Sequence, residues 1–193
     1  MILVVDNFDS FTYNIIQYVG ECGHEIEINQ NNNINFDQIE KGRYTHVVIS
    51  PGPGDPNSSG ECINLIRNFY KKIPILGVCL GHQAIGVFFG FSLKKHKTIC
   101  HGKISNITHS NNSVIYQNIP NIFKATRYHS LVISENKNIN KSIIVNAWLE
   151  DGTIMGVEHE KHPIYGVQFH PESIQTKWGK RIIQNFINNC TIQ

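Results

Sequence analysis

A cysteine between two glycines is the part of the sequence best suited to covalent chemistry. Cys79 lies in Gly77-Val78-Cys79-Leu80-Gly81, between two apolar runs. Glycines two positions before and after a nucleophile permit the sharp strand-to-helix turn that exposes its side chain above a sheet edge. The N-terminus of the following helix favours a thiolate and presents the Leu80 amide to an oxyanion. A buried structural cysteine is the alternative, and the pentapeptide alone leaves both open.

A base that could serve Cys79 occurs near the C-terminus. His170 and Glu172 follow a predicted strand over 164–169, and residues two apart in an extended segment face the same side. Glu172 could therefore orient His170, which would give a nucleophile, a base and an orienting group. Taken alone, one histidine among ten is more often a surface or core residue.

Two other segments could bind a substrate. Gly52, Pro53 and Gly54 follow a predicted strand, and the backbone N–H groups of this Pro-Gly loop suit an oxyanion or an amide substrate. Gln83 lies about one helical turn after Cys79, so its amide could bond the polar end of a substrate, although it could equally be a surface glutamine. The chain has neither a GxGxxG motif nor a Walker pattern, so a phosphate loop is not predicted.

A metal site deserves consideration because His96, Cys100 and His101 are close in sequence. The spacing does not match a structural zinc site and a fourth ligand is missing, so no metal is expected. Five cysteines without a CxxC pair predict neither a disulfide framework nor a zinc knuckle, and they indicate a reducing compartment. The other cysteines are expected to pack on apolar helix faces: Cys22, Cys62 and Cys190.

The elements that must position these residues alternate between strands and helices in the first half of the chain. The expected strands are 2–5, 25–28, 47–49 and 75–78. The expected helices are 11–22, capped by Ser10 and ended by Gly23, then 36–40, 62–69 and 84–89. Strands that are apolar throughout and alternate with helices predict a parallel sheet covered on both faces.

Beyond residue 91 the pattern changes to short β-rich segments. These are 102–108, 114–116, 131–134, 143–148, 154–158 and 164–169, with a hairpin turn at Asp151-Gly152 and a final helix around 182–190. The segments 29–35 and 94–97 are expected to be solvated surface loops. The sequence therefore predicts one α/β domain over 1–193, an open, mostly parallel doubly wound sheet with a β-rich C-terminal half.

The composition excludes several classes of protein. Of the 193 residues 40% are hydrophobic and 17% charged, which rules out a disordered chain, a collagen and a coiled coil. A net charge of +2 without strong clustering argues against a nucleic-acid binder. The apolar run 1–5 is too short and lacks the basic flank of a signal peptide, and no run approaches a membrane span. We expect a protein of the cytoplasm, or of the plastid stroma if it is encoded in an organelle, that is not secreted.

With Cys79, His170 and Glu172 in this order and a Pro-Gly-Pro-Gly loop, the chain resembles class I (triad) glutamine amidotransferases from end to end. Within that family it resembles the small subunit of anthranilate synthase and its close relative in aminodeoxychorismate synthase. Cys100 is a departure, because the family commonly has Met before His-Gly-Lys. The segments that carry this closer resemblance are 6–14, 101–103, 127–131 and 166–173.

The resemblance implies a flavodoxin-like fold and hydrolysis of L-glutamine to glutamate and ammonia. It implies that Cys79 attacks the carboxamide to form a thioester, that His170 transfers the protons and that Glu172 holds His170. It assigns the oxyanion hole to the amides of Gly52 and Leu80. The glutamine site that it implies consists of Gly52, Pro53, Gly54, Leu80, Gln83, Ser130 and Leu131.

The resemblance also implies a partner, a large chorismate-binding synthase subunit in an αβ or α2β2 hetero-oligomer. The ammonia would be passed to this subunit, which would hold Mg²⁺ and aminate chorismate to anthranilate, so no cofactor is expected in this chain. Aminodeoxychorismate synthase is the alternative partner, and one subunit could serve both enzymes. Two other readings remain: a cysteine peptidase or γ-glutamyl hydrolase with the same turn, and a non-catalytic binding module. No nucleic acid or membrane partner is expected.

Overall fold

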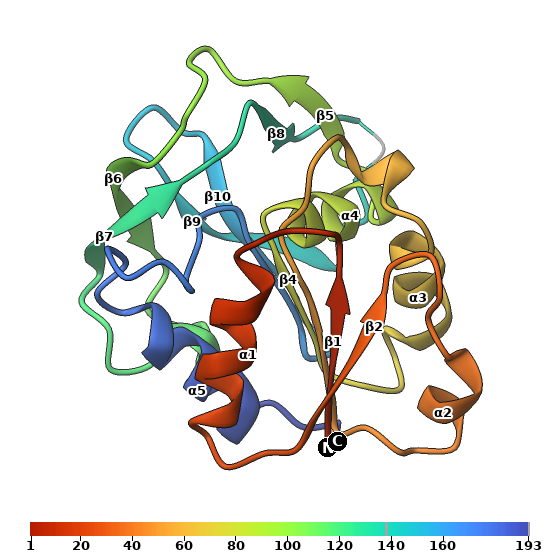
Figure 1. The fold of residues 1–193 in the computed structure, drawn as a ribbon. Coiled ribbons are helices and arrows are strands. Elements are labelled where there is room, and N and C mark those ends of the chain that lie inside the picture. The colour runs from red at the N-terminus through yellow and green to blue at the C-terminus, as the bar shows by residue number, and fades with distance from the viewer. Residues whose placement is uncertain (138, 193) are drawn as a thin grey trace.

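A nine-stranded sheet runs through the molecule in the computed structural model, which describes residues 1–137 and 139–192. The strand order is β2-β1-β3-β4-β11-β10-β9-β6-β7 (Figure 1). The first five strands in this order are parallel: β2 (Ile26–Gln30), β1 (Ile2–Asp6), β3 (His46–Ile49), β4 (Ile75–Val78) and β11 (Ile164–Val167). The last four are antiparallel: β10 (Ile154–His159), β9 (Ile143–Trp148), β6 (Lys103–His109) and β7 (Ile122–Arg127). A separate ribbon pairs β5 (Ser92–Lys95) with β8 (Leu131–Ser134).

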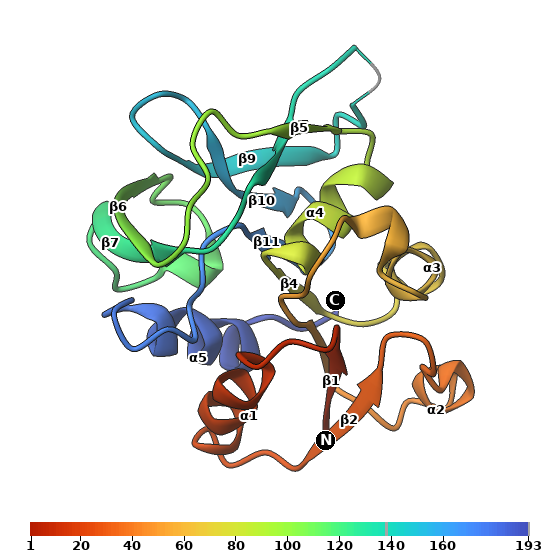
Figure 2. The same cartoon turned by 45° about the horizontal axis from the view of Figure 1, so that its top comes forward.

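Helices cover both faces of the parallel part (Figures 1 and 2). One face carries α1 (Thr12–Gly20) and α5 (Gly179–Asn189), and the other carries α2 (Phe36–Glu40), α3 (Cys62–Phe69) and α4 (Leu80–Phe88). Alternate residues of β1 enter opposite cores, Ile2 and Val4 beneath α1 and α5, Leu3 and Val5 beneath the other helices. The predicted doubly wound, mostly parallel sheet with a β-rich C-terminal half is therefore confirmed. None of the helices in the described part of the chain has the length and apolar character to span a bilayer.

The two ends of α1 differ from the prediction. Ser10 does not cap this helix, which begins at Thr12. The preceding turn is held instead by Asp9, whose Oδ1 accepts a hydrogen bond from the Phe11 N–H at 2.8 Å. Gly23 does not end the helix either, because α1 stops at Gly20 and Gly23 follows a further turn with a φ of +81°.

The β-rich half contains the largest errors of prediction. Residues 114–116 form a short 3-10 helix, not a strand, since an apolar run of three residues carries no periodicity. Strand β7 was not predicted at all. Lys94 and Lys95, expected in a loop, lie in β5 and pair with β8. Strand β5 is mainly polar and exposed, and β7 ends in the polar residues Thr126 and Arg127 although four of its six residues are buried. Pairing with a distant segment makes both of them strands. The predicted turn at Asp151-Gly152 is confirmed, with a φ of +79° at Gly152.

Smaller differences in element boundaries affect the site. Helix α4 begins at Leu80, not at residue 84, so it starts directly after Cys79. Strand β11 ends at Val167, two residues earlier than expected. The predicted surface loop 29–35 begins inside β2, and Asn31 within it is buried and donates a hydrogen bond to Asn7 Oδ1 at 2.9 Å.

Candidate active site

Cys79 lies at a sharp turn between β4 and α4. It adopts a φ of +51°, a left-handed conformation that is costly for a residue with a side chain. A Cβ on Gly77 would lie 2.4 Å from the carbonyl oxygen of Gly81, and a Cβ on Gly81 would lie 2.6 Å from the Ile49 oxygen. Only glycine at both positions lets α4 start directly above the strands. The turn is anchored by the Cys79 N–H, which donates to the Val167 oxygen at 2.8 Å.

His170 and Glu172 form a buried pair just beyond β11. His170 Nδ1 lies 2.6 Å from Glu172 Oε1, and both side chains are almost completely buried. The backbone of His170 is fixed from both sides, because its N–H donates to the Thr126 oxygen at 2.9 Å and its carbonyl accepts from Thr176 Oγ1 at 2.7 Å. Since Nδ1 is engaged by Glu172, Nε2 is the nitrogen left for Cys79, and it has no hydrogen-bond partner among the described residues.

The charges around His170 favour its protonated form. Burial by itself lowers the pKa of His170, but the adjacent Cys79 and the Glu172 carboxylate together hold this pKa well above its ordinary value. The raised pKa favours the imidazolium form of His170 beside the Cys79 sulfur. A cysteine with such a neighbour is suited to act as a nucleophile.

A cavity of about 200 Å³ opens beside Cys79. Most of the residues expected to bind glutamine line it, together with Cys79 itself and with Tyr128 and His129, which were not expected there. Its lining consists of Gly52, Pro53, Gly54, Cys79, Gln83, Tyr128, His129, Ser130 and Leu131. Leu80 lies outside this lining but packs against Gly52. The cavity is at the carboxyl edge of the parallel strands, where open α/β sheets bind ligands.

The Pro-Gly loop is tied to the loop after β1. The Asn7 N–H donates to Ser50 Oγ at 2.9 Å, and Asn7 Nδ2 donates to the Ser50 oxygen at 2.8 Å. A Cβ on Gly52 would lie 2.5 Å from Asn7 Cβ and 2.6 Å from Leu80 Cδ2. Glycine is therefore required where the loop meets the start of α4, because the Gly52 backbone lies directly against the side chains of Asn7 and Leu80.

Gln168 is a site residue that the sequence reasoning missed. Its buried side chain donates from Nε2 to Cys79 Sγ at 3.5 Å and accepts from Gln83 Nε2 at 3.1 Å. Gln83 Nε2 also donates to the Leu131 oxygen at 3.0 Å, so its amide nitrogen is already engaged inside the protein. Alternation could have identified Gln168, because it precedes His170 by two positions and shares its side of the segment.

Arg127 and His129 form a second pair that sequence reasoning did not single out. Arg127 is buried without a carboxylate partner among the described residues; its Nε donates to Ser105 Oγ at 3.0 Å and its Nη1 lies 3.4 Å from His129 Nε2. A guanidinium can only donate, so Nε2 accepts and the neutral ring carries its proton on Nδ1. Burial and the Arg127 charge lower the pKa of His129 to about 3, which keeps this wall of the cavity neutral.

The cysteines and histidines outside this site do not assemble into a metal centre. No group of three or more His, Cys, Asp or Glu side chains in the described ranges is placed to hold a metal ion, so His96, Cys100 and His101 are not a ligand set. Burial raises the pKa of Cys62 to about 12, and Cys190 is also buried, as expected of packing residues.

Comparison with known proteins identifies the family. Residues 3–190 match the family model described as glutamine amidotransferase class-I. The chain belongs to this family.

Curated relatives match nearly the whole of this chain. An anthranilate synthase component 2 from Cyanophora paradoxa is 47% identical over 97% of this chain and 98% of its own length. The aminodeoxychorismate/anthranilate synthase component 2 of Bacillus subtilis is 44% identical over 97% of this chain and 95% of its own. The bifunctional protein TrpGD of Thermotoga maritima is 49% identical over the whole of this chain, which spans only 33% of that relative.

Solved structures share the fold. A putative GMP synthase protein from Thermoplasma acidophilum superimposes with a TM-score of 0.83 at 27% identity, covering 96% of this chain and 91% of that one. A glutamine amidotransferase from Thermotoga maritima has a TM-score of 0.80 at 16% identity, covering 96% and 95%, and this likeness concerns the fold alone.

Proposed function

We propose that this chain is the glutamine-hydrolysing subunit of anthranilate synthase. The observation that carries the proposal is the buried pair of His170 and Glu172, 2.6 Å apart, beside a strained nucleophilic Cys79 that opens into a small polar cavity. A cavity of about 200 Å³ suits one small substrate such as an amino acid. The matching lengths and names of the component 2 relatives support the choice of synthase.

In the proposed reaction the Cys79 thiolate attacks the side-chain carboxamide carbon of glutamine, and the electron pair of the C=O bond moves to oxygen. The backbone N–H groups of Gly52 and Leu80 stabilise this oxyanion. When the oxyanion collapses, the C–N bond breaks and the nitrogen leaves as ammonia with a proton from His170. A water molecule then gives a proton to His170 and attacks the thioester, which releases glutamate and restores the thiolate.

Each supporting residue has a defined part in this scheme. Glu172 keeps the His170 ring oriented and stabilises its charge, and Gln168 donates a hydrogen bond to the thiolate. The glutamine substrate would contact the Pro-Gly loop, Gln83 and the backbone of residues 130–131. We propose that the chain itself needs no cofactor, and that Mg²⁺ and chorismate bind to the synthase subunit.

Free ammonia is a useful product only if it reaches a second reaction, since bulk water would protonate it and remove its nucleophilic electron pair. The partner must therefore seal the carboxyl edge around the cavity, in an αβ or α2β2 assembly. The Bacillus subtilis relative, whose name contains both synthases, supports a second candidate in which the same chain also serves aminodeoxychorismate synthase.

The proposal is tested by measuring glutamate release from L-glutamine by the purified chain, alone and with each candidate synthase subunit. Cys79→Ser is the control, because a hydroxyl in place of the thiol keeps the fold but removes the thiolate. We expect weak release by the isolated chain and strong stimulation by the anthranilate synthase subunit. Stimulation only by the aminodeoxychorismate subunit would favour the second candidate.

Two other outcomes would contradict the proposal. Cleavage of peptides or of γ-glutamyl conjugates in preference to glutamine would indicate a cysteine peptidase or a γ-glutamyl hydrolase. Failure of a glutamine analogue to alkylate Cys79, with no release under any condition, would indicate a binding module without catalysis.

A further inference from the structure

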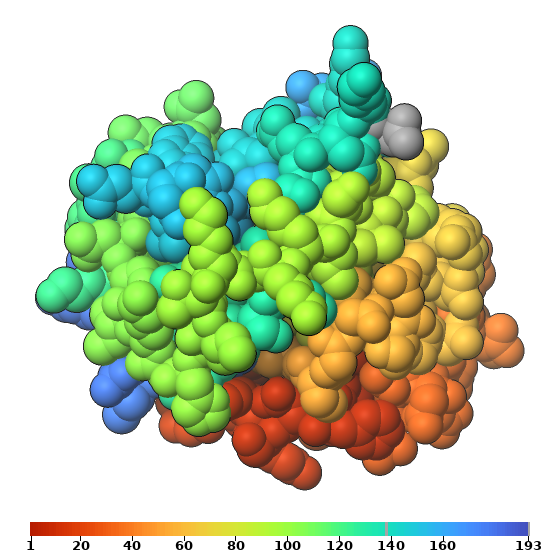
Figure 3. All heavy atoms as spheres, turned by 90° about the horizontal axis from the view of Figure 1, so that it is seen from above, coloured from red at the N-terminus to blue at the C-terminus, as the bar shows by residue number. Residues whose placement is uncertain are grey.

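The segment 94–101 is a prominent surface feature that glutamine hydrolysis itself does not require. It comprises the end of β5 and the loop that leads to β6. Seen from above the carboxyl edge, its yellow-green surface lies close to the red loop after β1 and the orange Pro-Gly loop (Figure 3). The segment therefore borders the face through which ammonia would leave.

The segment is tied directly to one wall of the cavity. The His96 N–H donates to the Ser130 oxygen at 2.8 Å, and the Cys100 N–H donates to the His129 oxygen at 3.0 Å. The His101 ring also packs edge-on against Tyr128, with centroids 5.5 Å apart. Because residues 128–130 line the cavity, a shift of the segment must shift this wall.

The outer side of the segment exposes an apolar side chain. Ile99 is 79% exposed although it lies between His96 and Cys100, both of which are fixed to the wall. A single exposed isoleucine is common on protein surfaces and proves nothing alone. Here the side chain projects from a segment whose backbone is held in place, as an apolar anchor at the centre of an interface would be.

Three exposed lysines lie next to Ile99, and one carboxylate, Asp151, is close enough for its charge to interact with Lys97. Lys94, Lys95 and Lys97 are exposed and surround a hollow of about 160 Å³, and none forms an ion pair in the described part of the chain. Asp151 lines the same hollow, but its Oδ1 is occupied by hydrogen bonds from the Thr153 N–H at 3.0 Å and Oγ1 at 2.6 Å.

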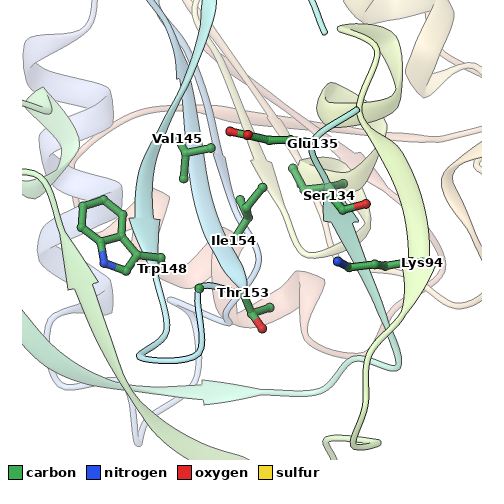
Figure 4. Close-up of a pocket in the computed structure, with 9 residues that line it drawn as sticks. Lys94, Ser134, Glu135, Val145, Trp148, Thr153 and Ile154 are labelled. Atoms are coloured by element: carbon green, nitrogen blue, oxygen red, sulfur yellow. The ribbon is translucent and has the colours of Figure 1, made fainter. Parts of the chain in front are cut away.

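A neighbouring pocket extends this hollow. It has a volume of about 470 Å³ and lies between the β5–β8 ribbon and the β9–β10 hairpin, and Lys94, Gly152 and Thr153 line both hollows. Figure 4 shows the Lys94 ammonium reaching toward Thr153 and Ile154 across this space. Glu135 lines this pocket beside Lys94, and Asp151 lines the smaller hollow, so lysines outnumber carboxylates on a concave surface that an acidic side chain of a partner can enter.

We infer that Ile99 and these lysines form a docking surface for the synthase subunit, which would offer an apolar socket bordered by carboxylates. The position beside the ammonia exit identifies this occupant, since the subunit that consumes ammonia must cover this edge, and the lysines favour a partner face that carries carboxylates. Docking on the segment sets the position of Tyr128, His129 and Ser130 and so raises glutaminase activity. The inference rests on the proposed function.

The test is a titration of the full chain with the synthase subunit, read as stimulated glutamate release. Ile99→Asp should raise the half-saturating concentration at least tenfold while the unstimulated rate stays unchanged. Lys95→Glu with Lys97→Glu should raise it severalfold, and this effect should shrink at high salt because exposed charges are screened.

Matched controls lie elsewhere on the surface. Ile122 is 58% exposed at the far end of β7, roughly 17 Å along the strand from Arg127, so Ile122→Asp should leave the titration unchanged. Lys71→Glu tests an exposed lysine four residues before the start of β4, at the opposite edge of the sheet, and it should likewise leave the titration unchanged.

The outcomes separate the two proposals. If the wild-type chain is not stimulated by any synthase subunit, the proposed function fails. If wild type is stimulated and Ile99→Asp is stimulated with the same half-saturation, the docking surface is overturned while the function stands. If Ile99→Asp instead changes the oligomeric state of the chain alone, as seen by light scattering, the surface pairs with a second copy and the inference is wrong.

Discussion

The parallel and antiparallel halves of the sheet build one cavity by different physical means. In the parallel half, Cys79 is fixed by backbone contacts so close that Gly77, Gly81 and Gly52 cannot carry a Cβ. In the antiparallel half, the wall is held by hydrogen bonds, from Arg127 between Ser105 and His129 and from the backbone N–H groups of His96 and Cys100. Steric exclusion leaves one conformation, whereas a hydrogen-bonded wall can shift at modest cost. We infer that the nucleophile is preformed and that the substrate-binding wall is adjustable.

Substitution of Gly81 by alanine should have the largest effect, because the new Cβ would lie 2.6 Å from the Ile49 oxygen, a backbone atom that cannot move aside. We expect a loss of about 5 kcal/mol or more, comparable to the whole stability of a small domain. Urea denaturation measures this. Gly20→Ala is the control, since its Cβ would meet only Ile26 Cδ1 at an ordinary 3.8 Å, and it should be neutral or slightly stabilising. A stable, active Gly81→Ala would refute a sterically fixed nucleophile.

Replacement of Glu172 by glutamine should abolish most of the catalysis without altering the cavity. The side-chain size is retained, but the ring of His170 loses the carboxylate that orients it and raises its pKa. We expect kcat to fall roughly 10³-fold, about 4 kcal/mol, with little change in KM. Steady-state kinetics with the synthase subunit present measure both constants. If instead KM rises and kcat is retained, Glu172 acts on substrate binding. The division between a catalytic parallel half and a substrate-binding antiparallel half would then be wrong.

The smallest expected effect concerns Arg127→Met in the adjustable wall. The Arg127 charge is the second cause, after burial, of the low pKa of His129, so its removal should raise this pKa above about 3. NMR titration can follow His129, with His82 as an internal reference, because burial alone lowers the pKa of His82 to about 3. An unchanged pKa for His129 would mean that Arg127 does not control this wall.

The low pKa of His129 makes the free energy of unfolding depend on pH. The folded pKa of His129 lies below the unfolded value of about 6.5, so wild type loses stability as pH falls through the window from about 6.5 to about 3. A higher folded-state pKa of His129 in Arg127→Met narrows the pH range over which stability is lost. The acid-induced loss of stability should therefore be smaller in Arg127→Met, by less than the roughly 1.4 kcal/mol that one pKa unit represents.

The parallel half of the sheet was also predicted more accurately from the sequence than the antiparallel half. Strands β1, β3 and β4 were predicted because each is a short apolar run between turn residues, and the turn at Cys79 was predicted from its glycines. Strands β5 and β7 were not, since β5 is mostly polar, β7 mixes apolar with charged residues, and both depend on pairing with β8 and β6. Likewise Arg127 carries no local signal that marks it as buried beside a cavity.

The sequence by itself determined the local chemistry: a thiol on a glycine-flanked turn, a histidine and a glutamate two residues apart, and a Pro-Gly loop. These follow from spacing, because backbone sterics and strand alternation act over a few residues. Only the tertiary structure decided that Cys79, the wall 128–131 and the pair at 170–172 meet, that the pKa of His170 is raised and that His129 is kept neutral. Burial and electric fields depend on groups far apart in the chain, so no local pattern contains them.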